Sequence, residues 1–221
     1  ITNVGTSHIG NLGSRENILK AKLEILDGLK SDGLLIINND NDLLNLWNTN
    51  NQDNHKHISY GIENKSDFIA KDIQVNENGS TFVIVLQGKE YTVEVPVPGK
   101  HFVYNSLAAI AVGLENNIKI EKIIEGISSF SLTKSRMEIL KNERNVTIIN
   151  DCYNASYESV KAALEYVSTI NANKKIAVLG DILELGEFSS KMHKLMGEEG
   201  GNNNIDILVT VFLVYALLVL L

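Results

Sequence analysis

The feature of this sequence that most constrains its fold is an alternation of short apolar runs with stretches of helical periodicity. Apolar runs bounded by glycine, asparagine or aspartate predict strands at residues 34–37, 81–86, 91–95, 146–149, 176–179 and 207–211. Apolar residues spaced three and four apart predict helices at residues 15–30, 104–115, 120–128, 157–169 and 190–199. This order of elements predicts an α/β protein.

The sequence predicts a different type of β-sheet in each of the two parts of the chain. In the first part, Gln87-Gly88-Lys89 joins two strands as a hairpin, which predicts a mixed sheet with helices. In the last third, strands and helices alternate, which is typical of a parallel sheet covered by helices. The short polar stretch 132–135 separates the two patterns, so we expect one domain at residues 1–133 and a second at 134–221.

Composition excludes several classes of function. With 44% hydrophobic and 21% charged residues, the chain of 221 residues can bury the core of a soluble protein. A formal net charge of −7 and the lack of any basic run disfavour a protein that binds nucleic acid or anionic membrane surfaces. Cys152 is the only cysteine, which rules out an internal disulfide and a cysteine-based zinc site and favours a reducing, cytoplasmic compartment.

The run 207–221 is almost entirely apolar. At about 15 residues it is shorter than the roughly 20 that cross a bilayer as a helix. We interpret it as a buried parallel strand, 205–211, followed by truncated or non-native sequence at 212–221. A tail anchor in a membrane is the alternative.

Lys22 is the first candidate for chemistry. In the predicted helix 15–30, with Ser14 as its N-cap, Lys22 falls near the centre of the apolar stripe. Because an unpaired buried ammonium is costly, such a lysine reaches the edge of the stripe, pairs with a carboxylate, or is held partly desolvated for chemistry. From the residues alone these interpretations stay open.

Two further candidates lie in loops. His8 belongs to a small-residue loop, 6–13, that follows residues 1–4, which resemble the end of a strand. Because α/β proteins bind ligands at the carboxyl ends of parallel strands, His8 could ligate a metal or act as an acid or base, although such a histidine is more often a plain surface residue. Gly99 and Asn105 flank a loop-to-helix junction, where an amide can both donate to and accept from an adenine edge.

Two acidic residues follow predicted strands. Asp151 comes after 146–150 and Asp181 after 176–180, so in one parallel sheet both carboxylates would emerge where a ribose or polar substrate sits. Each could instead cap a helix, and Ser156 is the predicted cap of helix 157–169. Cys152, which lacks a histidine partner, is interpreted as a packing residue. Neither a Gly-x-x-x-x-Gly-Lys-Ser/Thr phosphate loop nor a Gly-x-Gly-x-x-Gly motif occurs in the sequence.

Taken together, these stretches resemble the Mur ligases, the ATP-dependent enzymes that build the peptide of the peptidoglycan precursor. Residues 1–9 and 14–24 resemble the central ligase domain, and 99–109 match the family signature Gly-x-His-x-x-x-Asn-x-x-Ala-Ala. Residues 135–138 and 150–155 are similar to the opening of the carboxyl-terminal domain. The resemblance implies a central ATP-binding domain with a mixed sheet, followed by a Rossmann-like carboxyl-terminal domain, both incomplete in this chain.

Two motifs resemble one branch of the family, which adds D-alanyl-D-alanine to UDP-N-acetylmuramoyl-tripeptide. They are Tyr153-Asn154-Ala155-Ser156 and residues 178–187. The implied reaction is ADP-forming: ATP phosphorylates the peptide carboxylate, the amine of D-alanyl-D-alanine attacks the acyl-phosphate, and phosphate leaves. A monomeric cytoplasmic enzyme without nucleic-acid or membrane partners is expected.

The resemblance implies catalytic and metal-binding roles for Lys22 and His8. Lys22 corresponds to a lysine that is carbamylated and then helps to hold magnesium. His8 corresponds to a magnesium ligand. ATP and Mg²⁺ are therefore the expected cofactors.

Nucleotide and substrate contacts are implied at five further positions. Asn105 corresponds to the residue that faces adenine. Arg136 and Asp151 correspond to contacts with the nucleotide's phosphate and ribose. Tyr153 and Asn154 correspond to residues near the incoming dipeptide.

The chain departs from the family at both ends. The UDP-binding amino-terminal domain and the phosphate-loop strand are absent, so we expect the chain to be inactive alone, and 212–221 stands where the family continues into a turn and a helix. Two alternatives remain. One is another Mur-type or a folylpolyglutamate-synthase-like ligase, and residues 183–186 argue against the latter. The other is a non-catalytic pseudo-enzyme, tail-anchored through 207–221.

Overall fold

The computed structural model describes all residues except 51–53, 77, 144–145 and 212–221. Contacts divide the chain into two compact units. Unit 1 comprises Ile1–Gly5 and Ser14–Ser131, and unit 2 comprises Thr6–Gly13 and the chain from Leu132 onward. The segment Thr6–Gly13 thus leaves unit 1 and returns to it, so the backbone passes between the units three times, after Gly5, after Gly13 and after Ser131.

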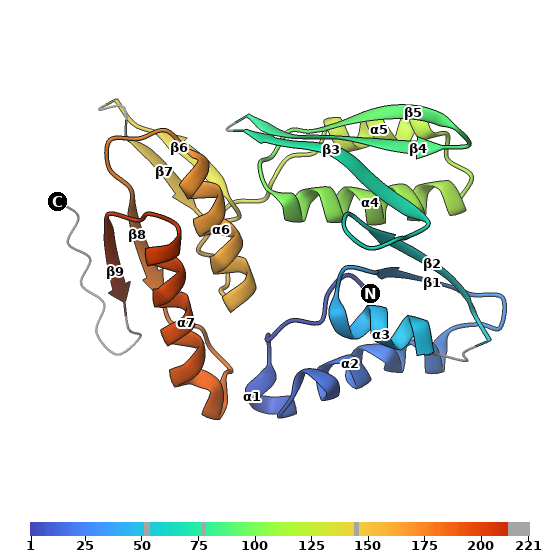
Figure 1. Ribbon diagram of the computed structural model, residues 1–221, viewed down its shortest axis with the longest axis horizontal. Coiled ribbons are helices and arrows are strands. Elements are labelled where there is room, and N and C mark those ends of the chain that lie inside the picture. Colours follow the sequence, from blue (N-terminus) through green and yellow to red (C-terminus); the bar gives the residue numbers. More distant parts are fainter. Residues whose placement is uncertain (51–53, 77, 144–145, 212–221) are drawn as a thin grey trace. The chain divides into compact units, whose positions relative to one another are not determined.

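Unit 1 is built on a five-stranded mixed sheet in the order β1-β2-β3-β4-β5 (Figure 1). The strands are β1 (Leu34–Asn38), β2 (Lys56–Gly61), β3 (Phe68–Asn76), β4 (Gly79–Leu86) and β5 (Lys89–Val95). The first three run parallel and the last three antiparallel, which confirms the predicted mixed sheet. Residues 1–4 are extended beside β1, where Ile1 bonds to the backbone of Ile36 and Asn38.

The β4–β5 connection confirms the predicted hairpin. Leu86 pairs with Lys89, so Gln87 and Gly88 form a two-residue turn. Both residues have positive φ, 49° and 79°, which is the backbone that a type I′ turn requires. Glycine adopts this conformation without strain, and the turn's twist matches that of the strands.

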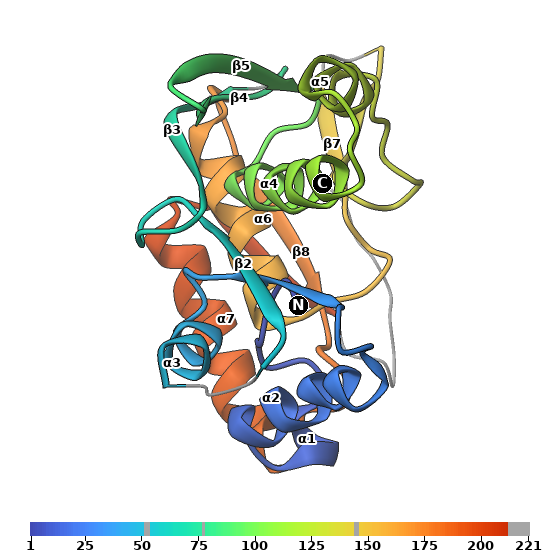
Figure 2. The ribbon, with the colours of Figure 1, turned by 90° about the vertical axis from the view of Figure 1, so that its right-hand side faces the viewer.

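The helices of unit 1 cover the sheet and its parallel edge. They are α2 (Arg15–Leu23), the 3₁₀ turn η1 (Glu24–Gly28), α3 (Asp42–Asn50), α4 (Lys100–Glu115) and α5 (Ile120–Ser128). Helix α4 contacts all five strands and lies alongside them in Figure 2. Its buried Val103, Leu107 and Ile110 supply much of the core. Helix α4 begins four residues before the predicted start, and α3 was not among the predicted helices.

Unit 2 combines two small sheets with helices. The strands are β6 (Glu138–Lys141), β7 (Thr147–Asn150), β8 (Ile176–Gly180) and β9 (Ile207–Val211). The helical elements are α1 (Ile9–Leu12), α6 (Tyr157–Thr169), η2 (Gly186–Phe188) and α7 (Ser189–Asn202). Within the part of the chain that the structure describes, β6 and β7 form one antiparallel pair and β8 and β9 one parallel pair.

The predicted parallel sheet of the last third is therefore only partly right. The parallel β8–β9 pair confirms it, but β7 does not join that sheet. Instead β7 pairs with β6, a four-residue strand with three exposed residues that carries little signal in the sequence. The two strands meet across a short connection in which Asn142 donates to the carbonyl of Val146.

Helix α6 begins where the sequence predicts. Ser156 accepts from the N–H of Ser159, and Ser159 bonds back to the N–H of Ser156, which forms a capping box. Helices α6 and α7 pack side by side (Figure 1). The buried Glu199 of α7 joins them, because it accepts from Tyr157 Oη at 2.7 Å and from Lys161 Nζ at 3.0 Å.

Among the described helices, none is long and apolar enough to cross a membrane. The predicted strand at 207–211 is confirmed as β9, which pairs in parallel with β8. None of its five residues is buried, so the prediction of a buried strand is wrong. The prediction of a truncated or anchoring tail at 212–221 lies outside the described residues.

Candidate functional site

Unit 2 holds the loop that carries His8. Buried Thr6 donates its N–H and its Oγ1 to the carboxylate of Glu158, at 2.8 and 3.1 Å. His8 adopts the left-handed conformation, with φ of 64°, at the start of α1. Its Nδ1 contacts Oε2 of Glu184, and Asn11 Nδ2 reaches the same oxygen at 3.4 Å. Two carboxylates of unit 2, one from α6 and one from the segment after β8, therefore contact the loop.

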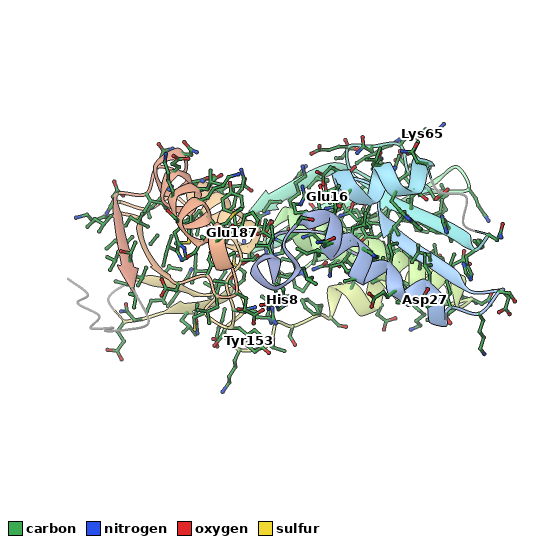
Figure 3. All side chains as sticks on the ribbon, turned by 90° about the horizontal axis from the view of Figure 1, so that it is seen from below. His8, Glu16, Asp27, Lys65, Tyr153 and Glu187 are labelled. Carbon is green, nitrogen blue, oxygen red and sulfur yellow. The ribbon has the colours of Figure 1, made fainter. Side chains whose placement is uncertain are left out.

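The backbone of the loop is fixed as well. The N–H of Gly10 donates to the carbonyl of Glu184 at 2.9 Å. A Cβ at position 10 would lie 2.4 Å from the nitrogen of Gly186 and 2.6 Å from the Glu184 oxygen. Only glycine permits this approach, because the atoms in the way belong to the backbone. The His8 loop and residues 184–186 therefore pack as one piece, with the His8 side chain at the surface (Figure 3).

Lys22 is not buried. It is exposed on α2, where Ile18 is the only buried residue. The α-helix ends at Leu23 and continues as the 3₁₀ turn η1, so the apolar stripe predicted over residues 15–30 is not continuous. The prediction of a desolvated lysine is therefore wrong, and the alternative of a lysine that reaches solvent agrees with the structure.

Asn105 lies exposed on the second turn of α4. The turn before this helix is set by buried Ser80, which accepts from the N–H of Gly99 at 3.0 Å and donates to the carbonyl of Val97 at 3.1 Å. Gly99 has φ of 129°, a conformation that favours glycine. Burial lowers the pKa of the His101 imidazole below its usual value. The exposed Asn105 amide therefore lies on α4, a helix whose preceding turn is fixed by backbone contacts to Ser80.

Asp40 is the centre of a hydrogen-bond network beside α4, and the sequence did not predict this network. Its carboxylate accepts from the N–H groups of Ile62, Glu63 and Asn64, at 2.5, 3.0 and 2.7 Å, and from Tyr104 Oη at 2.9 Å. Burial alone would raise the pKa of Asp40, but these four donors outweigh it and hold the pKa below its usual value. The run of amides and acids directly after β1 was the available signal, because strand ends of this kind carry ligands or turns.

Arg136, Asp151 and Tyr153 lie together in unit 2. The Arg136 guanidinium stacks 4.2 Å from the centre of the Tyr153 ring. Asp151 Oδ1 accepts from the N–H of Met137 at 3.0 Å. Burial raises the pKa of the Asp151 carboxyl, although the Met137 N–H and the Arg136 charge oppose that shift. Arg136 and Tyr153 are exposed, so the cluster presents a cation, an aromatic face and a half-buried carboxylate to solvent.

The predictions for Asn154, Asp181 and Cys152 have different outcomes. Asn154 is exposed beside Tyr153. Asp151 and Asp181 follow strands of separate sheets, so they do not share one sheet edge, and Ser156, not Asp151, caps α6. Asp181 lies 3.7 Å from His193, whose Nε2 accepts from the N–H of Ile182. Cys152 is exposed, and the interpretation of it as a packing residue is wrong.

No group of three or more histidine, cysteine, aspartate or glutamate side chains is arranged to hold a metal ion in the described residues. His8 offers one imidazole with a neighbouring carboxylate. An ammonium group has no lone pair, so Lys22 can contribute to a cation site only as a carbamate, and its exposed amine is accessible for that reaction. The donors present therefore fit a magnesium site only in part.

Comparison with known proteins accounts for both units. The family model described as the Mur ligase middle domain matches residues 1–113. The model described as the Mur ligase glutamate ligase domain matches residues 135–214. The chain is 41% identical over 208 residues to the UDP-N-acetylmuramoyl-tripeptide–D-alanyl-D-alanine ligase of Bacillus subtilis, and 30% identical to that of Escherichia coli. The alignment with the Bacillus protein covers 93% of this chain but only 44% of that protein. The alignment with the Escherichia protein covers 96% of this chain and 46% of that protein.

Solved structures agree. MurF from Acinetobacter baumannii superposes with a TM-score of 0.86 and 28% identity, over 95% of this chain and 45% of that one. MurF from Thermotoga maritima in complex with ADP gives a TM-score of 0.82 at 24% identity, over 95% of this chain and 47% of that one, and at that identity it supports the fold alone. The chain spans about half the length of the proteins it matches, and it belongs to the Mur ligase family.

Proposed function

We propose that this chain supplies part of an ATP-dependent, ADP-forming ligase that adds D-alanyl-D-alanine to UDP-N-acetylmuramoyl-tripeptide. In this proposal residues 1–133 belong to the central domain and 134–221 to the carboxyl-terminal domain. The grouping of Arg136, Asp151 and Tyr153 in unit 2 carries the proposal, because it joins a cation from the segment before β6 to an acid and an aromatic ring from the segment after β7. The relatives named above support the choice of substrates.

The nucleotide roles follow from the chemistry of each side chain. The exposed amide of Asn105 can donate to and accept from the adenine edge at once. The Arg136 guanidinium matches a phosphate oxygen pair, and the Asp151 carboxylate can accept from ribose hydroxyls. Burial raises the pKa of the Asp151 carboxyl, whereas the Met137 N–H and the Arg136 charge favour its ionised form. Removing either partner should therefore weaken ribose binding.

Magnesium would be held by His8 and by a carbamylated Lys22. A bound magnesium ion would offset the negative charge that builds up during phosphoryl transfer. The exposed amine of Lys22 and the exposed imidazole of His8 are both accessible, which supports this part of the proposal. Tyr153 and Asn154 are the side chains that we assign to the incoming dipeptide.

The proposal has the ligase act in the cytoplasm, as a monomer, with ATP, UDP-N-acetylmuramoyl-tripeptide and D-alanyl-D-alanine as its partners. The net charge of −7 and the single cysteine support a cytoplasmic protein without nucleic-acid partners. The acyl-phosphate of the tripeptide is the intermediate that the dipeptide amine attacks.

Phosphate release by a protein that joins this chain to an upstream phosphate loop tests the proposal. We expect release only when ATP, UDP-N-acetylmuramoyl-tripeptide and D-alanyl-D-alanine are present together. Asp151→Asn should raise the KM for ATP at least tenfold, whereas Asp27→Asn, a change of the same kind at an exposed carboxylate, should leave it unchanged. Equal phosphate release without the dipeptide, or equal KM values for the two variants, would contradict the proposal.

A further inference from the structure

We propose that Glu184 is a positioning residue for His8. Its carboxylate binds Nδ1 of the ring and leaves Nε2 as the nitrogen that can coordinate a cation. The cation-binding role of His8 rests on the proposed function, whereas the hold of Glu184 on the ring does not. Glu184 lies in the stretch after β8 that marks this branch of the family, 176 residues beyond His8 in the sequence.

The position of Glu184 relative to His8 is fixed by backbone and not by the side chains alone. The Glu184 carbonyl accepts from the N–H of Gly10 at 2.9 Å, two residues after His8. Gly186, with φ of 54°, packs so tightly on Gly10 that a Cβ on Gly186 would lie 3.0 Å from the Gly10 Cα. An exposed ion pair by itself contributes little to stability. Here, however, the backbone segments that carry His8 and Glu184 are already held in contact. The carboxylate therefore reaches His8 at little conformational cost.

A second carboxylate holds the chain two residues before His8. Glu158 accepts both donors of Thr6, two residues before His8, and Thr6 is only 7% exposed. His8 thus lies between two anchored residues, Thr6 and Gly10. Both anchors belong to unit 2, so unit 2 fixes the backbone on either side of His8.

The chemistry of the contact selects one form of the ring. An ionised carboxylate has lone pairs but no proton, so it can only accept a hydrogen bond. Nδ1 of His8 must therefore donate, and in a neutral ring Nε2 then carries the free lone pair. No hydrogen bond to Nε2 is formed by any residue in the described ranges. Metal-binding histidines commonly use this arrangement, in which a carboxylate on one nitrogen orients the other.

Nitrogen NMR of the ¹⁵N-histidine-labelled chain tests the proposal without metal or substrate. The spectra are recorded at pH 8.5, about two units above the ordinary pKa of histidine, and the ¹⁵N shifts distinguish Nδ1–H from Nε2–H. His8→Gln identifies the His8 signals among those of five histidines. We expect His8 in the unchanged chain to be protonated on Nδ1. Protonation on Nε2 overturns the proposal before any Glu184 variant is made.

Three variants then isolate the carboxylate. Glu184→Ala removes the acceptor and should convert His8 mainly to the Nε2–H form that free histidine prefers in water. Glu184→Gln keeps an oxygen acceptor and should retain Nδ1–H. Glu187→Ala is the matched control, because Glu187 is an exposed glutamate three residues further along the same stretch. A His8 ring that stays Nδ1–H in Glu184→Ala overturns the proposal.

Manganese separates this proposal from the proposed function. Mn²⁺ as a probe should broaden the His8 signals of the unchanged chain, and this broadening should need several-fold more Mn²⁺ in Glu184→Ala. If the ring form responds to Glu184 but Mn²⁺ leaves His8 sharp, Glu184 positions His8 and the metal role in the proposed function is wrong. If the ring form does not respond to Glu184 and Mn²⁺ broadens His8 equally in both proteins, the positioning role is wrong and the metal role stands.

Discussion

The two units of this chain bury their apolar side chains to different degrees. The largest fully buried side chains, among them Tyr60, Phe82 and Leu44, all lie in unit 1. In the described part of unit 2 the best-buried apolar residues are Leu185, at 2%, and Leu164, at 3%, and strand residues such as Val178 remain 39% exposed. A five-stranded sheet under α4 encloses an interior, whereas pairs of strands do not. Unit 1 should therefore be the more stable, and unit 2 should depend more on polar links.

Core substitutions should show the largest difference. We expect Phe82→Ala to lower the free energy of unfolding of unit 1 by about 4 kcal/mol and Leu164→Ala to lower that of unit 2 by about 2 kcal/mol, because a looser interior relaxes around the cavity. The chain offers one probe for each unit: Trp47 is its only tryptophan and lies in unit 1, and a dye on Cys152, its only cysteine, reports unit 2. Separate probes are needed because two units need not unfold together. Equal losses in urea unfolding would contradict the comparison.

Substitutions of Asp40 should have the second-largest effect on the stability of unit 1. Asp40→Ala leaves three N–H groups and the Tyr104 hydroxyl without their acceptor, so we expect unit 1 to lose about 2–3 kcal/mol. Asp40→Asn keeps one oxygen acceptor and should lose less. The Trp47 signal in urea should shift in both variants, while the Cys152 dye should report an unchanged unit 2. A shift in the dye signal would show that the units are coupled.

Glu199 is the counterpart of Asp40 in unit 2. Glu199→Gln should lower the stability of unit 2 by about 1 kcal/mol, because a neutral amide accepts less strongly from Tyr157 and Lys161. Tyr157 first, and then Lys161, hold the pKa of Glu199 below its usual value. Its contribution is thus complete above the unfolded pKa of about 4.3 and is lost as pH falls through the lower folded pKa. Dye-monitored unfolding between pH 3 and 7 should therefore vary less with pH in Glu199→Gln.

Surface ion pairs should not distinguish the units at all. Lys122 and Glu125 pair on α5, and Lys194 and Glu198 pair on α7. We expect Lys122→Ala and Lys194→Ala each to change stability by less than about 0.5 kcal/mol, since exposed pairs are screened and flexible. A loss above 1 kcal/mol in either unit would show that its surface charges form part of a larger network.

The sequence predicts the local features of this fold well. The Gln87-Gly88 hairpin, the start of α6 at Ser156 and the strand β9 follow from turn chemistry, capping and apolar runs within a few residues. Strands β2 and β3 escape prediction because they exist as strands through their partners on both sides. Helix α3 escapes because asparagine favours loops unless tertiary packing overrides it.

For the candidate site, too, local sequence is informative and contacts between distant residues are not predicted. Arg136, Asp151 and Tyr153 lie within a stretch of 18 residues, and the family resemblance assigned the first two to the nucleotide and Tyr153 to the dipeptide. Of the interpretations of Lys22, the desolvated lysine is wrong, because an apolar stripe predicts burial only if the helix continues, and α2 ends at Leu23. Contacts such as His8 with Glu184 link positions 176 residues apart, and no local pattern records which distant carboxylate a histidine meets.

The passage of Thr6–Gly13 into unit 2 also affects how the chain is made. A ribosome adds the partners of this loop, Glu158 and Glu184, 152 and 176 residues after the loop residues they contact. At elongation rates of about 5–20 residues per second, the two waits fall between roughly 8 and 35 seconds. Residues 1–4 can meanwhile pair with β1. The loop Thr6–Gly13 therefore lacks both carboxylate partners until most of this chain has been made, and the histidine proposed for metal binding reaches its contact with Glu184 late in the synthesis of the chain.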